Sequence, residues 1–202
     1  MLTEPRIILA SQSKYRAEQL QKLNYPFEQI ASECDESPHA AETVLSLVER
    51  LAEKKAQFIA EKLNLKNCEQ EWVVIGSDQA IALDHHILGK PGSHEIAKQQ
   101  LLTCSGRVLR VYTSLCVLSK KSPYRQIDVI VTDVIMRTLS EATIEHYLQL
   151  EKPYDCAGAI KSEGLGIGLI AGIYGQDPAG LIGLPLIRLT DFLLALEYQV
   201  PG

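Results

Sequence analysis

A short apolar run that passes directly into a capped helix is the feature that most constrains this chain. Residues Ile7–Ala10 are consecutive apolar residues, which is typical of a short buried strand. Ser11 or Ser13 then offers a helix N-cap, and Lys14 and Arg16 fall in the first turn. The helix dipole disfavours cations there and favours a bound phosphate. The stretch therefore predicts a polyanion site or, alternatively, only an exposed basic first turn.

The remaining chain alternates strand and helix patterns irregularly, which predicts a mixed α/β fold. Helices are expected over 43–63, 93–103, 140–150 and 186–196, and strands over 27–31, 72–76, 108–118 and 127–136. Ser93 and Ser140 are the expected caps of two of the helices. The chain has 202 residues and no linker or repeat, so we expect a single domain over residues 1–202.

Composition narrows the functional class. The net charge is −5 without a long basic block, which argues against a nucleic-acid-binding surface. We find no signal-peptide pattern and no apolar stretch of membrane-spanning length, so we expect no membrane partner. The five cysteines are scattered and form no CxxC pair, which favours free thiols and a cytoplasmic location. His85 and His86 lack further ligands at metal spacing and are expected in a surface turn.

Asp78 is the most conspicuous candidate for chemistry. It follows the strand predicted over 72–76, and the apolar pattern resumes at Ala80. An aspartate inside an apolar segment must be paired, hydrogen-bonded or bound to a metal. It could accept backbone hydrogen bonds in a turn, but we favour a functional role because sites in α/β folds collect at strand ends.

Two further pairs of charged residues leave alternatives open. Asp35 and Glu36 are either part of a solvated loop or ligands for Mg²⁺. Lys55 lies on the apolar stripe of the helix over 43–63 and Lys54 borders it. A lysine there either extends to the surface or points into a cleft, and periodicity does not decide between the two residues. The glycine-rich stretch over 156–168 matches neither a Walker loop nor a dinucleotide fingerprint.

Taken together, these motifs resemble the Maf family of nucleoside triphosphate pyrophosphatases over nearly the whole chain. No single motif is specific, but their order and spacing are. The resemblance is carried by Ile8–Arg16, Asp35-Glu36, Arg50–Ala56, Ile75–Gln79, Gly89–Pro91, Ser105-Gly106, Val111–Thr113, Cys156–Gly158 and Gly183–Leu186.

The resemblance implies a Maf/ITPase-like mixed-sheet α/β fold, elongated, with two lobes around a central cleft, in a family whose members are often homodimers. It implies hydrolysis of a nucleoside triphosphate to the monophosphate and pyrophosphate with a divalent cation, Mg²⁺ or Mn²⁺. Carried over by position, the proton acceptor is Asp78, the catalytic cations are Arg16, Lys55 and Lys90, a substrate-binding hydroxyl is Ser11, and the metal ligands are Glu36 and Asp78.

The stretch Lys161–Gly166 resembles the branch of the family that hydrolyses 7-methyl-GTP. Substrate-binding positions implied for the base are Tyr15, Gln79 and Glu163, although Tyr15 stands where that branch often has tryptophan. An aromatic ring can stack on the cationic methylated guanine, and a carboxylate can accept its N–H groups. The alternatives are a dTTP/UTP pyrophosphatase and a non-catalytic nucleotide-binding regulator of septum formation.

Overall fold

The computed structural model describes residues 6–65, 70–121 and 125–199. It divides into two compact units. The first comprises Met1–Gln79, Thr113–Ile130 and Asp177–Gly202, and the second comprises Ala80–Tyr112 and Val131–Gln176. Three long strands, β3 (Trp72–Leu83), β5 (Val108–Ser119) and β6 (Arg125–Met136), pass from one unit into the other.

The first unit contains two short strands and three α-helices besides the long strands. They are β1 (Arg6–Leu9), α1 (Lys14–Gln21), β2 (Phe27–Gln29), α2 (Val44–Leu65) and α5 (Leu186–Ala195), with a 3-10 turn, η3 (Gly180–Ile182). The second unit contains β4 (His86–Leu88), α3 (His94–Cys104), α4 (Glu141–Glu151), the 3-10 turns η1 (Ala157–Ala159) and η2 (Leu165–Leu169), and β7 (Ile170–Gly175).

The seven described strands form one mixed sheet. Its order is β2-β1-β3-β5-β6-β7, with β4 paired to β3 off this path. β1 runs parallel to β2 and to β3, with Ile8 opposite Glu28 on one side and Val74 on the other. The β3–β4 and β6–β7 pairs are antiparallel. A mixed α/β fold was the sequence prediction, and it is confirmed.

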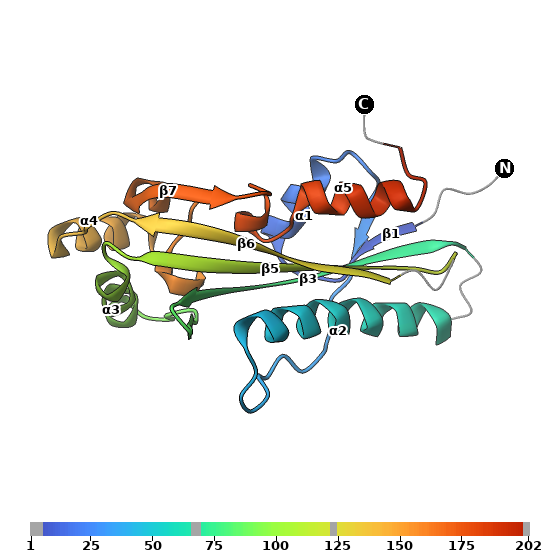
Figure 1. Ribbon diagram of the computed structural model, residues 1–202, viewed down its shortest axis with the longest axis horizontal. Helices are drawn as coiled ribbons and strands as arrows, with labels where there is room; N and C mark the ends of the chain where they lie inside the picture. The colour runs from blue at the N-terminus through green and yellow to red at the C-terminus, as the bar shows by residue number, and fades with distance from the viewer. Residues whose placement is uncertain (1–5, 66–69, 122–124, 200–202) are drawn as a thin grey trace. The chain divides into compact units, whose positions relative to one another are not determined.

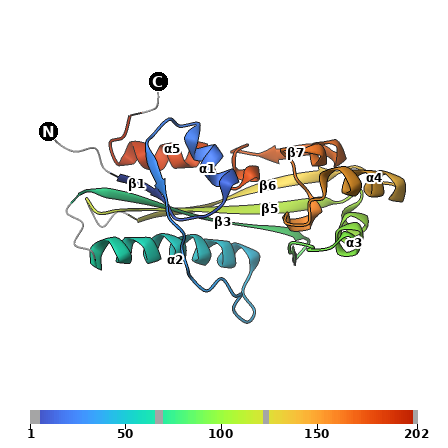
Figure 2. The ribbon, with the colours of Figure 1, turned by 180° about the vertical axis from the view of Figure 1, so that it is seen from behind.

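In the first unit, helices cover both faces of the sheet. Figures 1 and 2 show α2 along one face, and α1 and α5 along the other. Successive strand residues point to opposite faces, so Ile7 and Leu9 pack in the cluster with α1 and α5, whereas Ile8 and Ala10 pack in the cluster with α2. The apolar run that opens the chain is therefore buried on both sides, as a central parallel strand requires.

Local signals predicted most helix starts. Ser13, Ser93 and Ser140 each accept a hydrogen bond from the backbone N–H three residues on, so they cap α1, α3 and α4. The expected turn at His85 and His86 lies within the β3–β4 hairpin, with both side chains exposed.

One predicted strand was too short, and another strand was missed. The strand predicted over 72–76 continues through the apolar run that resumes at Ala80 and forms β3, so Asp78 lies inside a strand and not in a turn at its end. β7 was not predicted, because glycine is a weak strand former, and Gly172 interrupts the apolar pattern of this strand while Gly175 ends it. The polar turn expected over 120–125, between the strands predicted over 108–118 and 127–136, includes residues 122–124, which lie outside the described ranges.

Four of the five cysteines, Cys34, Cys104, Cys116 and Cys156, lie in the described ranges, and they are free thiols as predicted. Burial raises the pKa of Cys104 to about 11 and that of Cys116 to about 12, so these two thiols resist ionisation. Within the described ranges, every helix is too short or too polar to cross a bilayer.

Candidate active site

A lysine held between two carboxylates forms the centre of the candidate site in the first unit. The Lys55 Nζ atom lies 2.6 Å from Asp78 Oδ1 and 3.0 Å from Glu36 Oε1. Lys55 extends from α2, Asp78 from β3, and Glu36 from the loop between β2 and α2. Lys55 and Asp78 are only 5% and 8% exposed, whereas Glu36 is exposed. A buried ammonium and a buried carboxylate are stable here because each neutralises the other.

Close packing of α2 on β3 brings Lys55 to Asp78. Ala52 lies three residues before Lys55 and Ala56 directly follows it, and both alanines are fully buried against the sheet. They face Gly76, where a Cβ atom would lie only 2.2 Å from the Ala52 carbonyl oxygen. Small residues on both elements therefore let the helix backbone approach the strand that carries Asp78.

The structure gives the adjacent residues Lys54 and Lys55 different hydrogen-bond partners. Lys54 Nζ donates to the backbone carbonyl of Asp35 at 2.7 Å, and so it ties down the loop that carries Glu36. Lys55 points to the carboxylate pair instead. The two adjacent lysines thus have different partners, although helical periodicity alone left their roles open.

Arg16 contributes a second cation from the first turn of α1. Its Nε donates to the Gly183 carbonyl at 2.9 Å, and its Nη1 donates to Ser11 Oγ at 3.4 Å. Burial lowers the pKa of Arg16, while the charges of Asp78 and Glu36 act in the opposite direction. The predicted residues Ser11, Arg16, Glu36, Lys55 and Asp78 are therefore connected by hydrogen bonds, ion pairs or electrostatic interaction.

Asp78 is shifted toward the protonated state. Burial is the largest influence and raises the pKa of its carboxyl group above the ordinary value, and Glu36 adds to the increase. Lys55 and Arg16 lower this pKa and so oppose the shift. A carboxylate with a raised pKa is a better proton acceptor than a fully solvated one.

Residues on both sides of Asp78 are held by backbone carbonyls of the segment that precedes α5. Ser77 Oγ donates to Gly183 O at 2.9 Å. Gln79 Nε2 donates to Gly180 O at 2.8 Å, to Leu181 O at 3.1 Å and to Thr113 Oγ1 at 2.9 Å. The strand that carries Asp78 is thus fixed through its two neighbours.

The groups that hold this strand were not among the residues predicted from the sequence. Ser114 Oγ accepts from the Asp78 backbone N–H at 3.3 Å and donates to Val48 O on α2, which links the strand to the helix. Thr113 and Ser114 are fully buried hydroxyl residues within an apolar strand, and that pattern was a usable signal. The carbonyl groups of Gly180 and Gly183 carry no side-chain signature.

Tyr15, the second predicted site residue on α1 besides Arg16, is half-buried. The Lys14 ammonium lies 5.0 Å from the centre of its ring. The ring already attracts a cation, which is the property that stacking on a cationic base requires.

Two predicted residues belong to the second unit. Lys90 is exposed in the loop between β4 and α3, where the Gly92 N–H donates to Tyr154 O at 2.9 Å. Glu163 is exposed beside η2. Its segment is held by Glu151, which accepts from Lys161 Nζ at 2.8 Å and from the Leu165 N–H at 2.6 Å. The roles of Lys90 and Glu163 stay predictions.

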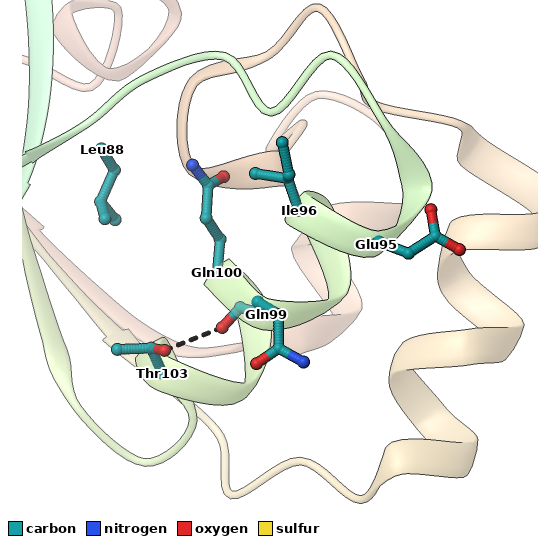
Figure 3. A pocket seen from close by; sticks show the side chains of 6 residues that line it. All are labelled: Leu88, Glu95, Ile96, Gln99, Gln100 and Thr103. Carbon is teal, nitrogen blue, oxygen red and sulfur yellow. Dashed lines mark hydrogen bonds between the residues drawn. The ribbon is translucent and has the colours of Figure 1, made fainter.

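A hollow of about 320 Å³ also lies in the second unit, along α3. Figure 3 shows the side chains around it, which are mostly apolar or uncharged: Leu88, Glu95, Ile96, Gln99, Gln100 and Thr103. It contains none of the predicted site residues and no cation, so it is poorly suited to a triphosphate.

The carboxylate pair is the only set of predicted metal ligands. Within the described ranges, no group of three or more histidine, cysteine, aspartate or glutamate side chains is arranged to hold a metal ion. Glu36 and Asp78 nevertheless converge on one ammonium group. Mg²⁺ is commonly held by one or two carboxylates, with substrate phosphates and water completing its shell, so this donor set fits a metal that binds together with a nucleotide.

The fold and this cluster define an α/β protein with a buried carboxylate–cation site suited to a phosphorylated substrate. Residues 6–196 match the model of the family described as Maf-like protein. The chain belongs to the Maf family, as the resemblance of its motifs indicated.

Curated relatives extend over almost the full length. Proteins named 7-methyl-GTP pyrophosphatase from Alkalilimnicola ehrlichii and Nitrosococcus oceani are each 46% identical, over 100% and 97% of this chain and 98% and 96% of theirs. One from Burkholderia orbicola is 44% identical over 97% of this chain and 92% of its own. Among solved structures, the Staphylococcus aureus Ham1 protein covers 66% of this chain and 72% of its own at 13% identity, with a TM-score of 0.39, a likeness too slight to support an argument.

Proposed function

We propose that this protein hydrolyses 7-methyl-GTP to 7-methyl-GMP and pyrophosphate, and so removes a modified nucleotide from the cellular pool. Relatives that are 43–46% identical over nearly the whole chain carry the name 7-methyl-GTP pyrophosphatase. The observation that supports hydrolysis best is the buried pair of Asp78 and Lys55, with Arg16 close enough to influence the pKa of Asp78. We further propose a cytoplasmic location, a single domain over residues 1–202 and a possible homodimer.

In this proposal, Asp78 accepts a proton from the water that attacks the α-phosphorus. Its raised pKa favours that role. Lys55, Arg16 and Lys90 neutralise the charge that develops on the phosphates, and Ser11 contacts the phosphate chain. Glu36 and Asp78 would hold the divalent cation, Mg²⁺ or Mn²⁺. That cation, when bound, supplies Lewis-acid stabilisation of phosphate oxygens.

Base selection rests on three residues in the proposal. Tyr15 stacks on the cationic methylated guanine. Glu163 accepts hydrogen bonds from the N1–H and N2 amine of guanine and offsets the positive charge. Gln79 contributes an oxygen, because its amide nitrogen is already engaged by three acceptors.

A panel of nucleoside triphosphates, with released pyrophosphate as the readout, tests the activity. We expect 7-methyl-GTP to be turned over faster than GTP, UTP or dTTP. Faster turnover of UTP or dTTP would favour the pyrimidine nucleotide pyrophosphatase instead. Nucleotide binding without pyrophosphate release in Mg²⁺ or Mn²⁺ would favour the non-catalytic regulator.

Two substitutions test the residue roles. Asp78→Asn should abolish turnover and preserve nucleotide binding, and full activity of this variant would remove Asp78 as the base. Glu163→Gln should reduce kcat/KM mainly for 7-methyl-GTP. Glu141→Gln is its matched control, because Glu141 is an exposed carboxylate of the same unit whose recorded ion partner is Lys98. An unchanged order of substrates in Glu163→Gln would refute its role as a base reader.

A further inference from the structure

Asp177 is a buried carboxylate that the proposed chemistry does not use. It lies in the first unit, three residues before the start of η3, and is only 2% exposed. Its Oδ1 accepts from the Ala179 N–H at 3.1 Å, and its Oδ2 accepts from the N–H groups of Ile187 and Arg188 at 2.7 and 3.1 Å. One carboxylate therefore fixes both ends of the segment over 179–187.

Asp177 also replaces a missing helix cap. The N-cap position of α5 is Pro185, which provides no side-chain hydrogen bond. The carboxylate of Asp177, several residues upstream, binds the N–H groups of the first turn instead, where a negative charge is favoured. The start of α5 is thus tied to the turn that precedes it.

The carbonyl groups of the segment fixed by Asp177 face the candidate active site. Gly183 O accepts from Arg16 Nε and from Ser77 Oγ, each at 2.9 Å. Gly180 O accepts from Gln79 Nε2, and also from Thr113 Oγ1 at 2.8 Å. Gly183 has φ of +117°, a conformation that glycine adopts readily, and this allows its carbonyl to reach both partners.

These contacts determine which end of the Gln79 amide is available. The two amide hydrogens are directed at three acceptor oxygens. A flipped amide would place Gln79 Oε1 against the carbonyls of Gly180 and Leu181, where oxygen would meet oxygen. Gln79 is therefore held with its nitrogen engaged and with its oxygen free of partners among the residues that the structure describes.

We propose that Asp177 is a positioning residue for the active site, which acts through the carbonyl groups of the segment over 179–187 to orient Arg16 and the Gln79 amide. The proposal deepens the proposed function, and rests on it for the roles of Arg16 and Gln79 toward substrate. Asp177 itself touches neither substrate nor the reacting atoms. By holding these carbonyl groups in place, Asp177 makes Gln79 present its oxygen, a hydrogen-bond acceptor, to a base.

A double-mutant cycle on Asp177 and Gln79 tests this coupling. Asp177→Ala, Gln79→Ala and the double variant are assayed on whichever nucleotide the native enzyme turns over fastest. We expect Asp177→Ala to lower kcat/KM by about tenfold or more, and the double variant to lose much less than the product of the two single losses. Asp177→Asn keeps one acceptor oxygen and should recover part of the loss.

Ser140→Ala is the matched control for a lost helix cap. Ser140 caps α4 in the second unit through its bond from the Thr143 N–H at 3.1 Å. Both Ser140→Ala and Asp177→Ala should lower the midpoint of urea unfolding, but only Asp177→Ala should change kcat/KM by more than about twofold. Folded Asp177→Ala with native kcat/KM, or losses that multiply in the double variant, would overturn the proposal.

A measurement without substrate separates this proposal from the proposed function. Hydrogen exchange of the Gln79 side-chain amide, followed by NMR, should be slow in the native protein, faster in Asp177→Asn, and unchanged in Ser140→Ala. If Asp177→Ala does not fold, Asp177→Asn carries the test. Equal exchange in Asp177→Asn and native protein refutes the positioning role, whereas absence of turnover on every nucleotide refutes the proposed function alone.

Discussion

Replacing Gly76 with alanine tests whether the close approach of α2 to β3 sets up the site. The added Cβ would lie 2.2 Å from Ala52 O and 2.9 Å from the Ala56 Cβ, whereas ordinary contact begins at 3.4 Å. The obstructing oxygen belongs to the helix backbone, so the helix itself must move by about 1 Å. Lys55 lies between Ala52 and Ala56 on that helix, and would move with them.

The magnitude follows from this displacement. Overpacking of this kind lowers the free energy of unfolding by about 1–3 kcal/mol. Alanine reduces the conformational entropy of the unfolded chain relative to glycine, which offsets about 0.4–1 kcal/mol of this loss. A displacement of about 1 Å in a positioned group can lower the rate about 100-fold. We therefore expect Gly76→Ala to remain folded, with a reduced urea midpoint and a much larger loss in kcat.

The assay compares Gly76→Ala with Gly168→Ala. Gly168 lies in η2 of the second unit, has no atom within 4 Å of an added Cβ, and has no positive φ. Gly168→Ala should match the native protein in both stability and pyrophosphate release. Native kcat in Gly76→Ala would refute the reasoning, because it would show that the contact between Lys55 and Asp78 does not depend on this close packing.

Three further predictions concern charge and base recognition. Lys55→Met removes a group that lowers the pKa of Asp78. In a pH profile of kcat/KM for the residual activity of this variant, the acid limb should therefore move to higher pH. An unmoved acid limb would mean that Asp78 does not govern this limb. Arg50 and the backbone hold the pKa of Glu42 at about 2, below its ordinary 4.5, so the Arg50–Glu42 ion pair stabilises the fold above pH 4.5 and this contribution is lost as pH falls toward 2. Arg50→Met should weaken the pH dependence of the free energy of unfolding measured by urea titration. The same pH dependence in Arg50→Met and the native protein would contradict this prediction. Tyr15→Ala should reduce the preference for 7-methyl-GTP over GTP by about tenfold, and Tyr15→Trp should preserve it; equal preferences in all three proteins would exclude stacking at this position.

Structural features that depend only on residues adjacent in the sequence could be predicted from the sequence. Helix caps are local, so Ser13, Ser93 and Ser140 were found correctly or as one of two candidates. The position of Asp78 within β3 was misjudged, because an aspartate between apolar runs is also the pattern of a turn.

The remaining features depend on contacts between distant segments. The contact between Lys55 and Asp78 spans 23 residues and depends on packing at Gly76, which periodicity does not reveal. The carbonyl of Gly183 is a backbone acceptor, and any residue has one. β7 ends at Gly175, where a Cβ would meet Thr132 Oγ1 at 2.7 Å, a constraint that is set by the neighbouring strand.

The position of Lys55 between Glu36 and Asp78 has a consequence for the protein without ligands. The ammonium group serves as a built-in counter-ion, so the two carboxylates do not need a metal to relieve their repulsion. A divalent cation entering the pair has to displace this resident charge, and the flexible four-carbon stem of lysine allows the ammonium to turn toward an arriving phosphate. The fold should therefore withstand chelators, and metal should bind more tightly when a triphosphate binds with it.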